Sequence, residues 1–193
     1  MKILAIGAHI DDPDFGCAGI LYKMAQKGDE VTYLALSDCD NPLLLKEVQL
    51  SSAILGVKLL ELFTFQRRVF SIHRQDILDI LIKYRDKIQP DIVFTHGSND
   101  GHQDHQVVYN ESLRAFKEQS VFGYNFPWNQ FHEPCKSLVT VKIDVEKKIE
   151  ALSKYESQKH RGYFNPEFIR AWNYSGETFE VIRLNEKMLC AAL

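Results

Sequence analysis

Short apolar runs alternate along this chain with stretches of helical periodicity, and this alternation constrains the fold more strongly than any other feature. Four apolar runs of strand length lie in the first half of the chain, at residues 2–8, 30–36, 58–63 and 91–95. Each is followed by a stretch with helical spacing of apolar residues, at 17–27, 44–55, 75–88 and 104–116. Strands that alternate with helices predict an α/β fold, a Rossmann-like three-layer sandwich whose mostly parallel central sheet carries helices on both faces.

The second half of the chain continues this pattern less regularly. We predict strands at 121–124, 138–143 and 179–184, and a helix at 145–157 with Asp144 as its N-cap. Residues 123–134 form the longest irregular stretch and are rich in aromatic side chains. A length of 193 residues suits one compact domain, so we expect residues 1–193 to form a single domain.

Charge and cysteine content narrow the classes of partner and compartment. The net charge of -3 gives no reason to expect nucleic acid or an anionic membrane as a partner. No 18 consecutive residues lack a charge, so we expect no membrane span. The four cysteines form no CxxC pair, which argues against a zinc knuckle and a disulfide framework and favours a reduced, cytoplasmic protein.

Two clusters of polar side chains follow the first and fourth predicted strands directly. The first cluster is His9, Asp11 and Asp12, and the second is His102, Asp104 and His105. In the usual doubly wound order these two strands are neighbours, and ligands bind in the crevice outside their carboxyl ends. We therefore expect the two clusters to face each other across one crevice.

These residue types suit a catalytic zinc site, in which imidazole and carboxylate ligands leave one position open for water. Such a metal acidifies water and polarises a carbonyl. Of Asp11 and Asp12, one can bind the metal while the other takes a proton. Asp104 could fix the tautomer of a histidine that is not needed as a ligand. Because His102 and His105 lie three residues apart, both could reach one ion, so the residues alone leave the ligand set open.

Simpler interpretations of the same residues exist. The aspartates of the His-x-Asp-Asp segment after the first strand could simply cap the next helix, and Asp100 or Asp104 could do the same for the fourth helix. Gly7 and the glycines after residue 15 also hint at a nucleotide-binding turn, but GxGxxG is absent and acidic residues would repel a pyrophosphate. We therefore favour the metal site over both alternatives.

Several segments resemble a known family, the PIG-L/LmbE-like zinc-dependent de-N-acetylases. AHIDDPDFGCAGIL is similar to the family signature AHPDDxEFGCGGTL, and FTHGSNDGHQDHQVV is similar to the second signature, THxxDxHxDH. Further along, KKIEALSKYESQ resembles the KxxAxxxYxSQ helix, and ETFEVIR resembles the terminal strand of the family. The likeness spans most of the chain.

The resemblance implies a role for each matching residue. His9, Asp12 and His105 would be the ligands of Zn²⁺, and Asp11 the general base. His102 would steady the oxyanion or protonate the departing amine, with Asp104 as its orienting partner. The implied reaction removes an N-acetyl group from an N-acetylated aminosugar, such as an N-acetylglucosamine conjugate, or from a related small amide. The resemblance also implies a homo-oligomer, a trimer or a hexamer.

Two positions depart from the family pattern. Ile10 replaces the usual proline, which loses a fixed φ angle but no functional group. On the second helix Lys46 replaces the arginine that often contacts substrate, so we predict Lys46 as a substrate-binding residue with a point charge in place of a planar fork.

Other candidates stay open at this point. Three interpretations are open for a group of aromatic residues, which line a sugar pocket, form a packed loop or make a subunit contact: Tyr124, Phe126, Trp128 and Phe131. We expect His96 and Asp100 to shape the loop after the fourth strand, or to support the metal ligands. His73 and His160 are expected at the surface, and Cys17 in the core. The alternative functions are a metal-dependent phosphoesterase with two metal ions and a non-catalytic sugar-binding protein on the same fold.

Overall fold

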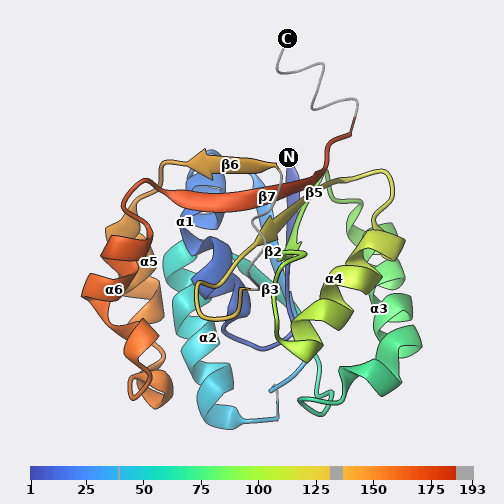
Figure 1. Cartoon of the computed structure of the whole chain (residues 1–193), viewed down its shortest axis with the longest axis horizontal. Coiled ribbons are helices and arrows are strands. Elements are labelled where there is room, and N and C mark those ends of the chain that lie inside the picture. Colours follow the sequence, from blue (N-terminus) through green and yellow to red (C-terminus); the bar gives the residue numbers. More distant parts are fainter. Residues whose placement is uncertain (39, 131–136, 186–193) are drawn as a thin grey trace.

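The computed structural model describes residues 1–38, 40–130 and 137–185. In this part of the chain one seven-stranded sheet forms the middle of three layers, with the strand order β3-β2-β1-β4-β5-β7-β6 (Figure 1). The strands are β1 Lys2–Gly7, β2 Glu30–Ala35, β3 Lys58–Leu62, β4 Ile92–His96, β5 Ser120–Tyr124, β6 Leu138–Val141 and β7 Glu177–Arg183. Strands β1 to β5 pair in parallel, whereas β7 runs antiparallel to both β5 and β6. The predicted fold class is confirmed.

The helices lie on both faces of this sheet (Figure 1). They are α1 Asp12–Gln26, α2 Pro42–Leu55, α3 Arg74–Ile88, α4 Gln103–Ala115, α5 Val145–Leu152 and α6 Pro166–Trp172. Helix α2 begins where the Asn41 side chain accepts the N–H groups of Leu43 and Leu44, and it ends at Gly56 with φ 70°. Asp144 accepts the N–H of Lys147 and so caps α5, as predicted. None of the helices in the described ranges is long and apolar enough to cross a membrane.

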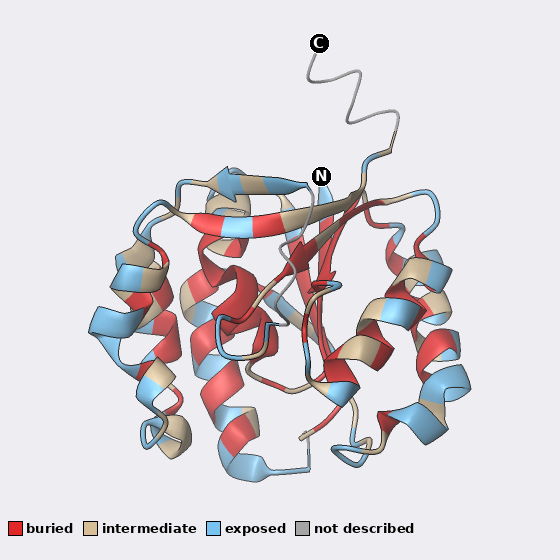
Figure 2. Cartoon of the chain, in the orientation of Figure 1, coloured by how far each residue is buried: buried red, intermediate tan, exposed pale blue. Residues whose placement is uncertain are grey.

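The apolar side chains of the central strands point alternately into two cores. From β1, Ile3 and Ala5 enter the core under α1, α2 and α5, while Leu4 and Ile6 enter the core under α3 and α4. All four are fully buried (Figure 2). Burial on both faces explains why β1 reads as a continuous apolar run in the sequence.

Two predicted helices need correction, and one further helix was not predicted. Helix α1 begins at Asp12 and not at residue 17, because Pro13 fits the first turn of a helix and starts it before the apolar periodicity begins. The helix predicted at 145–157 ends at Leu152, and Glu156–Gln158 form a separate 3-10 turn. Helix α6 was not predicted, although Asn165 caps it by accepting the N–H of Glu167 and proline follows at its first position.

Strands β1 and β4 are neighbours at the centre of the sheet, as the usual winding order predicts. Chain connections run outward from this point, to β2 and β3 on one side and to β5 on the other. The loops after β1 and β4 therefore leave the same edge of the sheet side by side.

Candidate active site

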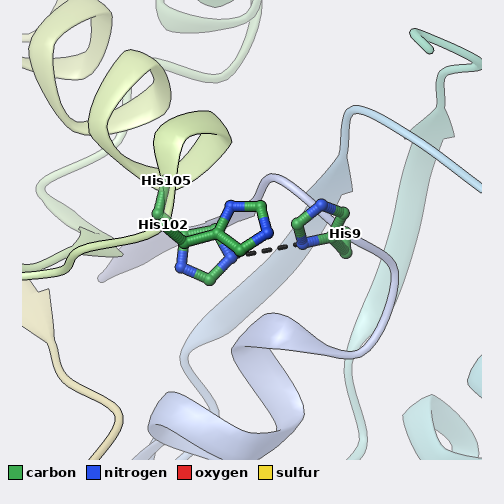
Figure 3. A group of neighbouring side chains, drawn as sticks. All are labelled: His9, His102 and His105. Carbon is green, nitrogen blue, oxygen red and sulfur yellow. Dashed lines mark hydrogen bonds between the residues drawn. The ribbon is translucent and has the colours of Figure 1, made fainter. Parts of the chain in front are cut away.

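The loops after β1 and β4 bring His9, Asp12 and His105 together. His9 follows β1, Asp12 opens α1 and His105 lies in the first turn of α4. His9 Nδ1 lies 3.2 Å from His105 Nε2 and 3.3 Å from Asp12 Oδ2. His105 Nε2 lies 3.5 Å from Asp12 Oδ2, so the three atoms form a triangle. Figure 3 shows the imidazole of His9, from the loop after β1, facing the imidazole of His105, from the start of α4.

This triangle fits a tetrahedral metal site. Ligand bonds of about 2.0–2.1 Å at tetrahedral angles place neighbouring ligand atoms about 3.3–3.4 Å apart. The three measured distances lie within about 0.2 Å of that spacing. The donor set of two imidazoles and one carboxylate also suits Zn²⁺ with an open position.

Two further histidines lie close to this triangle. The rings of His9, His102 and His105 form one candidate ligand group, and Asp12, His96 and His105 form another. However, His96 Nε2 accepts the N–H of Ala8 at 3.1 Å, so the lone pair that would bind a metal is already used. His102 Nδ1 accepts the N–H of Asp104 at 3.2 Å and caps α4. When neutral, His102 must then carry its proton on Nε2.

Two buried aspartates contact the histidines of the triangle from the side away from their facing atoms. Asp100 Oδ2 lies 2.8 Å from His105 Nδ1, which fixes the tautomer whose Nε2 lone pair is free. Asp104 Oδ2 lies 3.3 Å from His9 Nε2. The resemblance implied that Asp104 orients His102, but the structure pairs its carboxylate with His9. Asp100, expected to shape the loop or to support a ligand, contacts His105 directly.

Burial and neighbouring charges set the protonation of the remaining two residues. Burial, with the charge of Asp12, raises the pKa of Asp11 to about 6, although His9 and Arg161 act in the opposite direction. Burial and the charges of His105 and His9 lower the pKa of His102 to about 4. The pKa of Asp11 is therefore close to neutral pH, as suits a general base. At neutral pH His102 is uncharged and can donate a hydrogen bond.

A cavity of about 260 Å³ opens beside these residues, with Asp11 and His102 in its wall. Its aromatic lining comprises Phe15, Phe126, Trp128 and Tyr163. The rings of Trp128 and Tyr163 stack with centroids 4.2 Å apart. Of the predicted aromatic residues, Phe126 and Trp128 line the cavity. Tyr124 is buried below it, where its hydroxyl donates to the Ile6 carbonyl, and Phe131 lies outside the described residues.

The cationic lining differs from the sequence-based expectation. Lys46 is exposed and does not line the cavity, whereas Arg67, Arg68 and Arg161 do. The sequence signal for the first two was a pair of arginines shortly after the third strand. Gln158, another lining residue, belongs to the KxxAxxxYxSQ segment but was not singled out.

Residues expected away from the site lie away from it. His160 is exposed, His73 is partly exposed, and Cys17 is fully buried in the core. One supporting residue was missed. Glu47 on α2 accepts the N–H and the hydroxyl of Ser157 at 2.8 and 2.6 Å, and so holds the turn that carries Gln158.

Known structures share this fold. The zinc-inhibited form of teicoplanin deacetylase Orf2 matches with a TM-score of 0.77 at 16% identity, covering 96% of this chain and 100% of its own. The N,N'-diacetylchitobiose deacetylase of Pyrococcus horikoshii matches with a TM-score of 0.72 at 21% identity, covering 94% and 82%. GalB, the 4-carboxy-2-hydroxymuconate hydratase of Pseudomonas putida KT2440, matches with a TM-score of 0.71 at 16% identity, covering 90% and 85%. These likenesses show the fold, and the fold carries more than one reaction.

Sequence comparison goes further than the fold. YaiS, an uncharacterised deacetylase of Escherichia coli K12, is 30% identical in an alignment of 142 residues that covers 67% of this chain and 77% of YaiS. The family model of PIG-L, GlcNAc-PI de-N-acetylase, matches residues 4–116, more than half of the chain. This match includes both polar clusters. The chain therefore belongs to the PIG-L family of deacetylases.

Proposed function

We propose that this protein is a zinc-dependent hydrolase that removes the N-acetyl group from an N-acetylated aminosugar. The observation that carries the proposal is the triangle of ligand atoms from His9, Asp12 and His105. Asp11 and His102 line the same cavity beside it. The membership in a deacetylase family supports the same reaction.

His9, Asp12 and His105 would hold the metal ion. When bound, such an ion supplies a water molecule with a pKa near neutrality and polarises the carbonyl of the amide. Asp100 and Asp104 keep His105 and His9 oriented for this task.

Asp11 and His102 would carry out the proton transfer and charge stabilisation. Asp11 takes a proton from the attacking water as the new C–O bond forms, and its raised pKa matches that task. The Nε2–H of His102 donates a hydrogen bond to the oxygen that gains negative charge. The C–N bond then breaks, the nitrogen receives the proton that Asp11 holds, and acetate and a free amine leave.

The aromatic wall would bind the sugar. The stacked Trp128 and Tyr163 offer flat apolar faces, which suit the C–H groups of a pyranose ring. The side-chain oxygen of Gln158, Oε1, is buried and has no hydrogen-bond partner among the described residues, so it can accept a hydroxyl or amide N–H of the substrate.

Acetate release from N-acetylglucosamine and N,N'-diacetylchitobiose by the zinc-loaded protein tests this function. In Asp11→Asn, which keeps the shape of the side chain, we expect zinc to stay bound and turnover to fall by about 10²–10⁴-fold. Asp79→Asn, an exposed site on α3, is the matched control and should not change turnover. Unchanged turnover in Asp11→Asn would refute the assignment of the base, and absence of acetate release from every N-acetylated sugar would refute the reaction.

Metal stoichiometry separates this proposal from a two-metal phosphoesterase. The hydrogen bond from Ala8 to His96 argues against a second ion, because it occupies the lone pair that the second ligand group would need. The cytoplasmic location and the trimeric or hexameric state stay predictions.

A further inference from the structure

The arginines of the cavity differ in whether a carboxylate neutralises them. Arg67 Nε donates to Asp38 Oδ1, so its charge is paired. Within the described residues, no carboxylate forms an ion pair with the guanidinium of Arg68 or of Arg161. Arg161 donates instead to the hydroxyl of Tyr163 at 2.6 Å and lies 5.8 Å from the centre of that ring.

The acidic residues of the cavity do not neutralise this pair. Asp12 faces the imidazoles of His9, His96 and His105. Asp11 is near enough to Arg161 for the two charges to interact, but no hydrogen bond joins them among the described residues. Two guanidinium groups of the cavity wall, those of Arg68 and Arg161, therefore have no carboxylate partner among the described residues, and most of their N–H donors can bind a ligand.

The backbone at Arg68 is held in a strained conformation. Its φ of 68° lies in the left-handed region, which a residue other than glycine rarely adopts. Its N–H donates to Asp104 Oδ2 at 2.6 Å, and the same carboxylate oxygen lies 3.3 Å from His9 Nε2. The segment that carries Arg68 is therefore fastened to the histidine beside the reacting centre.

Asp38, which pairs with Arg67, also has a left-handed φ, of 74°. The loops after β2 and β3 are thus joined to each other by this ion pair and to the site by Asp104. Strain of this kind persists where the surrounding contacts enforce it, and it gathers at ligand-binding positions. The strained and hydrogen-bonded backbone at Arg68 is therefore typical of a ligand-binding position.

We propose that the natural substrate carries an anionic group, a carboxylate or a phosphate, that Arg68 and Arg161 bind while the acetamido group lies at the metal centre. A guanidinium presents a planar fork of donors that matches either anion. This inference rests on the proposed function, because it assigns a substrate class to the same cavity.

Ligand binding, measured by calorimetry without turnover, tests the proposal. The probes are neutral N-acetylglucosamine, its 6-phosphate and the carboxylate-bearing N-acetylmuramic acid. Each is titrated into the zinc-loaded Asp11→Asn variant, whose turnover we expect to be about 10²–10⁴-fold slower, and the arginine substitutions below are made in this variant. We expect at least one anionic probe to bind about 10-fold or more tightly than the neutral sugar. A preference for the phosphate would identify that group, and a preference for N-acetylmuramic acid would identify the carboxylate.

Substitution of the arginines then tests whether Arg68 and Arg161 cause the tighter binding of the anionic probes. In Arg68→Gln and Arg161→Gln the preference for the anionic probe should fall by about 10-fold, while the Kd of the neutral sugar stays within about 2-fold. Lys58→Gln removes an exposed positive charge at the start of β3 and should leave all Kd values unchanged. The Tm of each variant shows that it is folded, and Arg161→Gln keeps the test valid if Arg68→Gln unfolds.

Two results would overturn the proposal. One is equal affinity of the Asp11→Asn variant with both arginines intact for neutral and anionic probes. The other is a preference that survives both arginine substitutions, which would place the anion on the metal and not on the arginines. Because binding is read without turnover, failure of acetate release alone would refute the proposed function and leave the anion preference measurable.

Discussion

Two buried clusters of charged side chains in this protein differ in how completely neighbouring protein groups satisfy their hydrogen bonds. In the first, Lys148 on α5 and Glu177 on β7 form an ion pair at 2.8 Å, and both residues are almost fully buried. Glu177 also accepts the N–H groups of Gly19 and Ile20, and Lys148 also donates to Asn173. The charges of Lys148 and Glu177 balance. This cluster, which we call the Lys148–Glu177 pair, joins α1, α5 and β7.

The second cluster is the triangle of His9, Asp12 and His105. Its three facing atoms lie 3.2–3.5 Å apart, too far for strong hydrogen bonds but at the spacing of ligands around one ion. The residues behind it, Asp100 and Asp104, are fully bonded. The contrast teaches that the Lys148–Glu177 pair is satisfied by neighbouring protein groups, whereas the triangle has the spacing of a candidate metal site.

Removal of a triangle residue should have the largest effect, and it should fall on metal binding. We expect His105→Ala to weaken zinc affinity by about 10³-fold or more, because a ligand bond is lost outright. The metal-free form of the variant should lose about 1–3 kcal/mol of unfolding free energy relative to the metal-free wild-type protein, because Asp100 Oδ2 loses its bond to the imidazole. Zinc competition titration and urea unfolding measure the two quantities. Retained affinity would show that His105 is not a ligand.

Breaking the Lys148–Glu177 pair should have the opposite signature. Lys148→Met leaves the carboxylate of Glu177 buried without its cation, which costs about 3–5 kcal/mol of unfolding free energy. Zinc affinity of the folded variant should stay within a few-fold. The double variant Lys148→Met with Glu177→Gln should recover part of the loss, because no unpaired charge remains. A loss below about 1 kcal/mol in urea unfolding would contradict this assignment.

The smallest effect is expected for a residue that supports the triangle from behind. Asp104→Asn should lower zinc affinity by about 10–100-fold, because Asp104 orients His9. If Asp104 served His102 instead, as the family resemblance implies, kcat would fall while zinc affinity stayed constant. Parallel measurement of zinc affinity and of kcat at saturating zinc therefore decides which imidazole Asp104 serves.

The sequence predicted those parts of the site that follow directly from strand order. His9 and Asp12 stand next to one strand and His105 next to another, so the adjacency of β1 and β4 was enough to place them at one crevice. The burial of Cys17 and of the central strands was also predictable from the sequence, because the pattern of apolar residues indicates which positions are buried.

The wall of the cavity was not predictable in this way. Arg68 and Arg161 come from loops that no simple rule places, and their approach depends on how η1 (Phe70–His73) and the turn after α5 pack against the sheet. Lys46 was expected from its helix, but its side chain is exposed outside the cavity. The partner of Asp104 was beyond the sequence as well, since His9 and His102 are both close enough in the fold to bind it. Only side-chain geometry distinguishes them.

The most direct test of the account is the number of metal ions bound per chain. Elemental analysis of protein purified without added metal or chelator should give about one zinc per chain, and Asp12→Asn purified in the same way should give much less. If the protein takes up no metal even when zinc is supplied, the three residues do not form a metal site and the proposed hydrolase must be withdrawn. Two ions per chain would contradict the single-ion triangle and favour the two-metal phosphoesterase.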